Sequence, residues 1–75
     1  MNLLDTVALL VEVKGRSMDG QEICLLRGQV GTVIETGDAE VVFVEFAGID
    51  GVGYALAPIA CSNLLRLHHE KPIVS

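Results

Sequence analysis

The stretch from Leu25 to Glu35, LLRGQVGTVIE, is the most informative part of this chain, because two glycines separated by two residues introduce a β-branched strand. Gly28 can adopt the positive φ of a tight turn. Gly31 has no side chain, so another strand can pass close to the backbone at that point. The residues from Val30 to Glu35 then alternate between the two faces of a strand. The stretch therefore predicts a bent strand of a small β-barrel.

The residues before this stretch predict one strand and one loop. From Asp5 to Val13, apolar residues recur at every second position, which is typical of a strand with one buried face. The segment from Lys14 to Glu22 is polar and carries two glycines, so it is predicted to be a loop. This loop is long for so small a domain.

The residues after the stretch predict a hairpin. Thr36 to Ala39 has the composition of a turn, and Glu40 to Phe46 is rich in β-branched and aromatic residues. A second turn is expected at Gly48 to Gly51. Val52 to Ala57 then forms a strand that ends before Pro58, because proline cannot donate a hydrogen bond to a neighbouring strand. These two strands should pair with each other.

A short helical element and a last strand complete the expected fold. Ala60 to Asn63 is predicted to form a 3₁₀ turn, and Leu64 to Leu67 a short strand beside the first one. Five short strands with close turns describe an all-β, SH3-like five-stranded barrel with one 3₁₀ turn before the last strand. The sequence thus predicts a single domain over residues 1–67 and a C-terminal tail over residues 68–75.

Several of these segments together resemble a small bacterial family of domains of unknown function that is common in cyanobacteria. The resemblance rests on LLDTVALL at 3–10, RGQVGTVIE at 27–35, VEF at 44–46, DG at 50–51, YAL at 54–56 and LLRL at 64–67. It implies an SH3-like barrel and a small accessory protein, often encoded beside a second small protein, as an antitoxin or an immunity protein is. The chain departs from the family pattern in its longer segment between Val13 and Arg27, and in its apolar Phe43, where an acidic residue is frequent.

Size and composition favour a chain that associates with a partner or with itself. A domain of 75 residues buries only about 60 to 65% of the surface that its unfolded chain exposes, so its stability margin is small. The chain is nevertheless 51% hydrophobic, and a barrel of this size has few interior positions for those side chains. We therefore expect a homo-oligomer or a stable complex with another protein.

The charge of the chain points to a protein partner. The formal net charge is −5, and the five basic residues form no run. A phosphate backbone would be repelled at long range, which argues against nucleic acid, whereas a basic protein surface would be attracted. No secretion signal or apolar segment of membrane-spanning length is found, so a cytoplasmic location without a membrane partner is expected.

No group of residues has the spacing of a catalytic, cofactor or metal site. His68 and His69 are adjacent and have no further ligand at a suitable spacing. Cys24 and Cys61 are predicted to be small, buried or half-buried hydrophobic residues with reduced thiols. The ten carboxylates are scattered, and neither a P-loop nor a dinucleotide-binding motif occurs. The sequence therefore predicts a protein that is not an enzyme and that binds no cofactor and no metal.

The outward face of the strand from Glu40 to Phe46 is the predicted partner-binding site. If the residues at 42, 44 and 46 face inward, the two-residue period of a strand turns their neighbours outward. Tyr54 on the next strand could extend this patch, or it could be an ordinary half-buried tyrosine of the barrel. The loop or the tail could equally fold over the patch. The predicted partner-binding residues are Val41, Phe43, Glu45 and Tyr54.

Three classes of function remain, of which a non-catalytic protein-binding module is favoured. Its carboxylates from Glu35 to Glu45 and its outward apolar strand would engage a basic protein, in the manner of an antitoxin, an immunity protein or an accessory subunit. The alternative is a nucleic-acid-binding barrel of the KOW type, whose glycine-containing strand the run from Gly28 to Ile34 resembles. Such barrels normally need a basic or aromatic platform, and this chain has no Trp. A small enzyme is least expected, because no nucleophile, base and orienting group converge.

Overall fold

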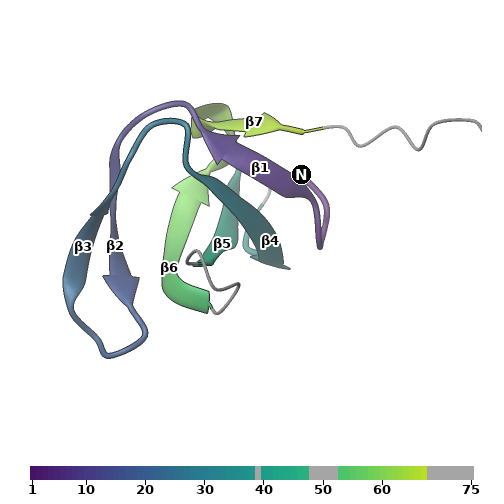
Figure 1. The fold of residues 1–75 in the computed structure, drawn as a ribbon. Coiled ribbons are helices and arrows are strands. Elements are labelled where there is room, and N and C mark those ends of the chain that lie inside the picture. The colour runs from purple at the N-terminus through teal and green to yellow at the C-terminus, as the bar shows by residue number, and fades with distance from the viewer. Residues whose placement is uncertain (39, 48–52, 68–75) are drawn as a thin grey trace, which may run out of the picture.

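Seven antiparallel strands form one open sheet in the order β3-β2-β6-β5-β4-β1-β7 (Figure 1). This computed structural model describes residues 1–38, 40–47 and 53–67. The elements are β1 (Thr6–Leu9), β2 (Val13–Ser17), β3 (Glu22–Leu25), β4 (Val30–Thr36), β5 (Val41–Ala47), β6 (Gly53–Ala60), the 3₁₀ helix η1 (Cys61–Asn63) and β7 (Leu64–Arg66). The predicted all-β class is confirmed.

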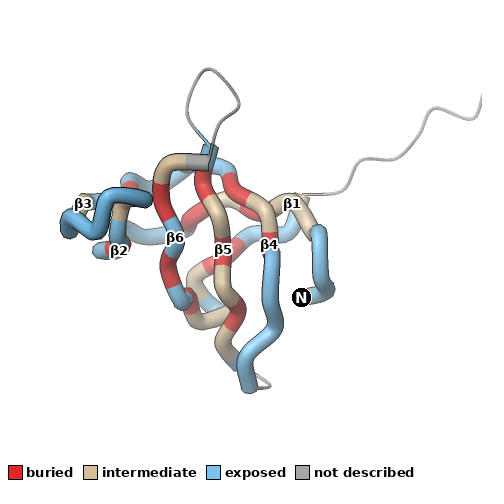
Figure 2. The backbone as a smooth tube through the Cα atoms, turned by 90° about the horizontal axis from the view of Figure 1, so that it is seen from below, coloured by how far each residue is buried: buried red, intermediate tan, exposed pale blue. Residues whose placement is uncertain are grey.

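The core lies on the concave side of the sheet and follows the alternation of the strands. On β5, Val42, Val44 and Phe46 are buried, as the pattern predicted (Figure 2). Alternate residues of the neighbouring strands meet them there. The buried core consists of Val7, Leu9, Leu25, Val33, Val42, Val44, Phe46, Ala55, Ala57, Ile59 and Leu64. Burial of a large apolar side chain stabilises a fold by about 1.5 to 3 kcal/mol, so this cluster supplies most of the driving force.

Strand β4 lies close to β5 because Gly31 has no side chain. A Cβ atom at this position would lie 2.6 Å from Val44 Cγ1 and 2.8 Å from the carbonyl oxygen of Glu45. Gly28, in the turn before β4, has a φ of +88°. Both expectations drawn from the glycine pair are therefore confirmed.

The segment predicted to be a loop, Lys14 to Glu22, contains most of a β-hairpin, so that prediction is wrong. β2 and β3 are antiparallel neighbours joined by a turn in which Gly20 has a φ of +88°. Buried and exposed positions alternate in β2, but the sequence does not show it, because the buried position is Gly15. A Cβ atom at Gly15 would lie 2.7 Å from Leu25 Cδ1. The Leu25 side chain of β3 thus fills the space that a side chain of β2 would need.

The first strand is shorter than its alternation predicted. β1 ends at Leu9 and β2 begins at Val13, so the chain turns a corner within the predicted strand. At this corner Leu10 donates its backbone N–H to the carbonyl of Asn63, at 2.9 Å. Leu9 is buried and Val13 packs against the core. Apolar residues continue to alternate in the sequence across the corner, although Val11 is 41% exposed, which is why the pattern could not reveal the corner.

The number of strands differs from the prediction. The five expected strands are all present as β1, β4, β5, β6 and β7, and the unexpected hairpin adds β2 and β3. In the residues described, β3 and β7 are the two edges of the sheet and do not pair with each other. The architecture is therefore an open sheet of seven strands, where five strands in a closed barrel were expected.

The C-terminal part of the prediction holds with one change. The 3₁₀ turn is present as η1, and β7 pairs with β1 as expected. β5 and β6 form the predicted antiparallel pair, but β6 continues through Pro58 to Ala60. The predicted turn at Gly48 to Gly51, the start of the second hairpin strand at residue 52 and the tail with both histidines lie outside the described residues.

Candidate protein-binding surface

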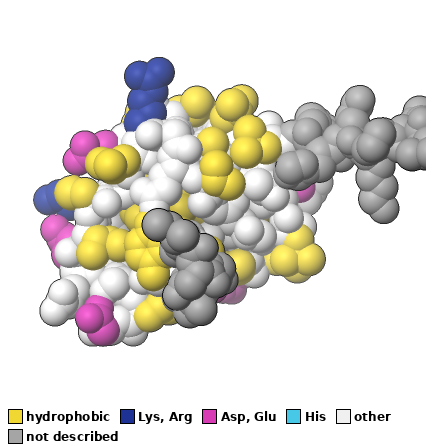
Figure 3. Space-filling view, in the orientation of Figure 1, with side chains coloured by type: hydrophobic (Ala, Val, Ile, Leu, Met, Phe, Trp, Pro, Cys, Tyr) yellow, Lys and Arg dark blue, Asp and Glu magenta, His cyan; other side chains and the backbone are white. Residues whose placement is uncertain are grey.

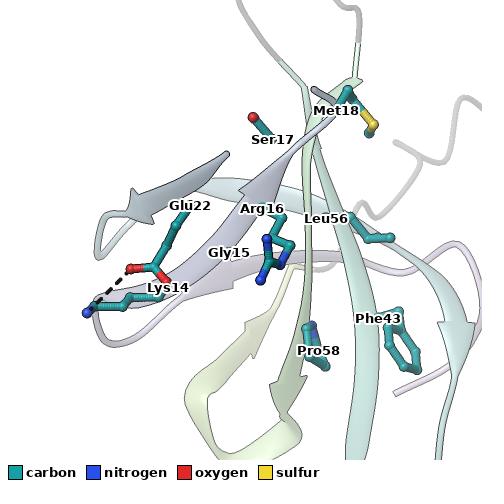
Figure 4. Close-up of a pocket in the computed structure, with 9 residues that line it drawn as sticks. All are labelled: Lys14, Gly15, Arg16, Ser17, Met18, Glu22, Phe43, Leu56 and Pro58. Atoms are coloured by element: carbon teal, nitrogen blue, oxygen red, sulfur yellow. Dashed lines mark ion pairs between the residues drawn. The ribbon is translucent and has the colours of Figure 1, made fainter. Parts of the chain in front are cut away.

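A groove of about 460 Å³ lies between the β2–β3 hairpin and the outward face of β5 and β6 (Figure 4). β2 pairs with β6 only at Arg16↔Leu56 and Ser17↔Ala55. Toward its N-terminal end β2 has no further pairing with β6, and the groove opens there. Its lining residues are Lys14, Gly15, Arg16, Ser17, Met18, Glu22, Phe43, Leu56 and Pro58.

Pro58 accounts for the end of the pairing between β2 and β6. The carbonyl of Tyr54 accepts a hydrogen bond from the backbone N–H of Met18, so the polar groups of Tyr54 point toward β2. The backbone N–H and C=O groups of successive residues point to opposite edges of a strand, so those of Leu56 and Pro58 also point toward β2. Proline has no N–H to donate, and the pairing stops after Leu56. Pro58 is thus tolerated inside β6 because its missing donor faces an unpaired edge.

The floor of the groove is apolar. Phe43 lies opposite Pro58 in the register of β5 and β6, and Leu56 follows on the same face of β6. Phe43 is half-buried, whereas Leu56 is 38% and Met18 56% exposed. Figure 4 shows Met18 at one end of the groove and Pro58 and Phe43 at the other. An apolar floor of this kind can bury part of a partner's side chain.

The cationic groups on the hairpin side of the groove already have partners. Lys14 Nζ lies 3.5 Å from Glu22 Oε1, with the two side chains 73% and 64% exposed. Arg16 Nη1 donates a hydrogen bond of 3.1 Å to the carbonyl of Gly20, within the same hairpin. An ion pair as exposed as Lys14–Glu22 contributes at most about 1 kcal/mol, so a ligand could displace it easily.

Carboxylates lie beside Phe43 on β4 and β5, although they are not among the residues that line the groove. Glu35 of β4 lies opposite Phe43 in the register of β4 and β5, and Glu45 lies two residues further along β5. Neither carboxylate forms an ion pair within residues 1–38, 40–47 and 53–67. Asp38 and Glu40, in the turn between β4 and β5, are exposed and add further negative charge. These unpaired carboxylates suit a cationic ligand.

The tip of the β2–β3 hairpin is held by hydrogen bonds of Asp19. Its carboxylate accepts a hydrogen bond from the Ser17 hydroxyl and one of 3.5 Å from the backbone N–H of Gln21. These two hydrogen bonds, that from Ser17 foremost, lower the pKa of the Asp19 carboxyl below its usual range. The hairpin that borders the groove therefore has a fixed turn.

Three of the four predicted partner-binding residues share one face of β5. Val41, Phe43 and Glu45 point away from the buried residues of that strand and are half-buried. Of these, Phe43 lines the groove. The hairpin that replaces the predicted loop borders Phe43 on one side, which explains why this side chain is only partly accessible.

Tyr54 is separate from the other three predicted residues. It packs against the hydrophobic core, and its hydroxyl forms a hydrogen bond with the side-chain amide of Gln29. It lines a neighbouring depression together with Ile23 and Cys24, and this depression shares Ser17 and Met18 with the groove. The position of Tyr54 on β6 does not predict its hydrogen bond to Gln29, because the two residues are 25 positions apart in the sequence.

Most of the residues that line the groove were not identified from the sequence. The hairpin residues Lys14, Arg16, Met18 and Glu22 were assigned to a loop, and Leu56 and Pro58 to the end of a strand. One signal was available in the sequence. Charged residues at 14 and 16 flank a glycine, as in a strand whose charged side chains face outward and whose inward position has no side chain.

The described residues contain no group of three or more potential ligands that could hold a metal ion. No helix in this part of the chain is long and apolar enough to cross a membrane. Both cysteines are free thiols, and Cys61 is half-buried, as predicted. Cys24 is exposed, so the prediction of burial is wrong for this residue. It lies on β3, where residues with its orientation face away from the core.

The family model described as "Domain of unknown function (DUF4926)" matches residues 3–66. The chain belongs to this family. The match covers the seven strands found in the described part of the chain and every residue that lines the groove. No curated protein and no solved structure matches the chain.

Proposed function

We propose that this DUF4926 domain is a non-catalytic protein-binding module whose groove engages a basic segment of another protein. The observation that carries the proposal is the combination of an apolar floor with unpaired carboxylates beside it. Phe43 lies between Pro58 on β6 and Glu35 on β4. A lysine or arginine could place its aliphatic stem on the Phe43 ring and its charge beside Glu35.

The net charge of −5 supports the same partner. A basic protein would be attracted at long range and would associate faster at low ionic strength. An antitoxin, an immunity protein or an accessory subunit in the cytoplasm acts by holding a partner in this way, and we propose this class of role for the domain.

We also propose that the strands β6-β5-β4-β1-β7 are a variant of the SH3-like barrel. β1 pairs with both β4 and β7, and η1 comes directly before the last strand. The β2–β3 hairpin is then a structured insertion between the first two barrel strands, and the groove forms where this insertion meets β5 and β6.

The proposal is tested by capture of the partner on the tagged chain from its native cytoplasm at moderate salt, followed by mass spectrometry. We expect a basic protein in stoichiometric amount with the wild-type chain. Leu56→Glu, at an exposed position of the groove floor, should lose that protein, whereas Leu65→Glu, at an exposed position of β7 outside the groove, should retain it.

Three results would overturn this proposal. The first is capture of no stoichiometric protein, and the second is equal capture by both variants. The third is co-elution of nucleic acid that nuclease and high salt remove, which would favour the KOW-type alternative. Circular dichroism of each variant shows whether the fold is retained.

A further inference from the structure

The outward face of the sheet carries opposite charges on the two sides of the groove. Arg16 of β2 pairs with Leu56 of β6, and Leu56 pairs with Glu45 of β5. Residues directly opposite one another in a sheet point to the same face, so these three side chains form one row. This row runs across the strands from a cation, through an apolar residue, to a carboxylate.

A second row with the same order lies beside the first. Pro58 of β6 is opposite Phe43 of β5, and Phe43 is opposite Glu35 of β4. Lys14 comes two residues before Arg16 on β2 and is exposed on the same face, so it begins this row across the opening of the groove. Figure 4 shows the order from left to right, with both cations on the left and Phe43 on the right.

Arg16 is the cation of the groove lining that lacks a carboxylate partner. Lys14 pairs with Glu22, whereas the Arg16 side chain bonds to the carbonyl of Gly20 and forms no ion pair in the part of the chain that the structure describes. Figure 3 shows charges of both signs at the hairpin end of the molecule, on the left. A carboxylate of a bound segment would therefore be attracted to this end of the groove.

We propose that the groove binds an extended segment of the partner that crosses β2, β6, β5 and β4 and carries an acidic, an apolar and a basic residue in that order. The acidic residue pairs with Arg16, and the apolar residue packs on Leu56 and Phe43. The basic residue approaches Glu35 and Glu45. This inference rests on the function proposed above, because it specifies the segment that the same groove recognises.

The spacing of the strands fits the spacing of side chains in an extended peptide. The strands lie in the order β2-β6-β5-β4, and neighbouring strands are about 4.8 Å apart. The carboxylates on β5 and β4 are therefore about 10 to 14 Å from β2 across the sheet. Residues i and i+4 of an extended peptide point to the same side about 13 Å apart, with residue i+2 between them. Three alternate residues of the segment thus match the three parts of each row.

Neither a purely basic nor a purely acidic segment is complementary to the whole site. A purely basic segment would place a like charge beside Arg16, which favours the mixed segment over it. A purely acidic segment, or the phosphate backbone of a nucleic acid, would place like charges beside Glu35 and Glu45. A segment with one acidic and one basic end meets an opposite charge on both sides of the apolar floor.

A randomised peptide library displayed on phage tests the proposal without knowledge of the partner. Selection on the wild-type chain should yield peptides with an acidic and a basic residue at positions i and i+4 and an apolar residue at i+2, in either chain direction. Selection of basic and apolar residues alone would overturn this inference and leave the proposed function in place. Selection of no common pattern would also overturn it.

Arg16→Glu separates this inference from binding of a purely basic segment. A synthetic peptide of the expected pattern should bind Arg16→Glu about tenfold more weakly than the wild-type chain in calorimetric titration, because two carboxylates then face each other. A purely basic segment would bind this variant more tightly. Arg27→Glu is the matched control, since it makes the same change of charge at an exposed arginine outside the groove. It should change the affinity by less than about twofold.

Arg16→Gln keeps the test valid if circular dichroism shows that Arg16→Glu does not fold. It removes the charge of Arg16 without placing a carboxylate opposite Glu22 in the hairpin. Equal binding of the peptide to wild type and Arg16→Gln, or tighter binding to Arg16→Glu, would overturn the proposal. If Leu56→Glu still lost the peptide in that case, the groove would remain the binding site and only the acidic contact would be wrong.

Discussion

The two outward surfaces of this sheet differ in charge, although they are built from neighbouring strands. The groove over β5 and β6 combines an apolar floor with Lys14, Arg16 and Glu22 on the hairpin side, and the carboxylates of Glu35 and Glu45 lie beyond Phe43, outside its lining. The outward surface of β4, β1 and β7 combines apolar side chains with threonine, and Glu45 of β5 borders it opposite Thr32. Apolar exposure is common to both, and the charged residues Lys14, Arg16 and Glu22 that line the groove are what separate the two surfaces.

Binding of a basic partner and association of the chain with itself should respond oppositely to salt. Attraction between the carboxylates beside the groove and a basic partner weakens as the ionic strength rises, whereas repulsion between two acidic chains weakens and their association improves. The direction of the salt effect on a complex therefore shows which kind of association has formed.

The largest effect is expected from Gly31→Ala, which should disrupt both surfaces together. β4 lies between β5 and β1, so it connects the two outward surfaces. The new methyl group would lie 2.8 Å from a backbone oxygen, which cannot move without shifting β5. We expect a loss of about 3 kcal/mol in the free energy of unfolding, measured by urea titration.

Gly20→Asn is the matched control for this substitution. A Cβ atom there meets no atom within 4 Å, and asparagine tolerates the φ of +88°. The expected change is below about 1 kcal/mol. An equal loss of stability for both variants would show that close packing at Gly31 does not hold the two surfaces together.

The next largest effect is on the groove alone. Phe43→Glu should weaken binding of a captured partner by about 2 kcal/mol, roughly 30-fold, because it places a carboxylate on the apolar floor. Calorimetric titration measures the binding, and circular dichroism reports the fold. If Phe43→Glu unfolds the chain, Phe43 is a core residue, and its assignment to the binding surface is wrong.

A smaller effect is expected from Leu4→Gly, at a residue whose backbone N–H bonds to the carbonyl of Val33 on β4. Leu4 is 72% exposed, so its side chain gains little from burial. Glycine removes the strain at φ +68° but adds flexibility to the unfolded chain. We expect a gain of up to about 1 kcal/mol in the free energy of unfolding, measured by urea titration. A variant less stable than wild type would contradict the description of Leu4 as a strained, exposed residue.

The smallest effect concerns the hairpin tip. Hydrogen bonds from Ser17 and Gln21 favour the charged form of Asp19, so its pKa in the folded chain is below the ordinary value of 3.8. This contribution to stability is present above that ordinary value and is lost as the pH falls through the folded pKa. An NMR titration should place the Asp19 midpoint below 3.8 in wild type and nearer to it in Ser17→Ala. Identical midpoints would contradict the Ser17 hydrogen bond.

The sequence predicted the parts of the fold in which alternation and glycine chemistry act locally. The inward residues of β5, the turn at Gly28 and the close approach at Gly31 were all read correctly. The β2–β3 hairpin was missed because its inward position is Gly15, which leaves no apolar residue to reveal the period.

The candidate site was only partly predictable for a related reason. Phe43 was identified from its own strand, but the groove depends on which strand β2 meets and on where that pairing ends. The strand was predicted to end before Pro58, but β6 continues to Ala60, and only its side toward β2 is unpaired at Pro58. Tyr54 was assigned to the patch from its place on the neighbouring strand, with a half-buried tyrosine as the alternative, and its bond to Gln29 could not be predicted because the two residues are distant in the sequence.

The central claim is that the partner binds in the groove and not on the outward surface of β4, β1 and β7. It is tested most directly by the mass of the complex that the tagged chain forms with its captured partner, measured by light scattering for wild type, Leu56→Glu and Leu65→Glu. The account predicts a complex that contains the partner for wild type and Leu65→Glu, and the chain without a partner for Leu56→Glu. Loss of the partner in Leu65→Glu, or its retention in Leu56→Glu, would contradict it.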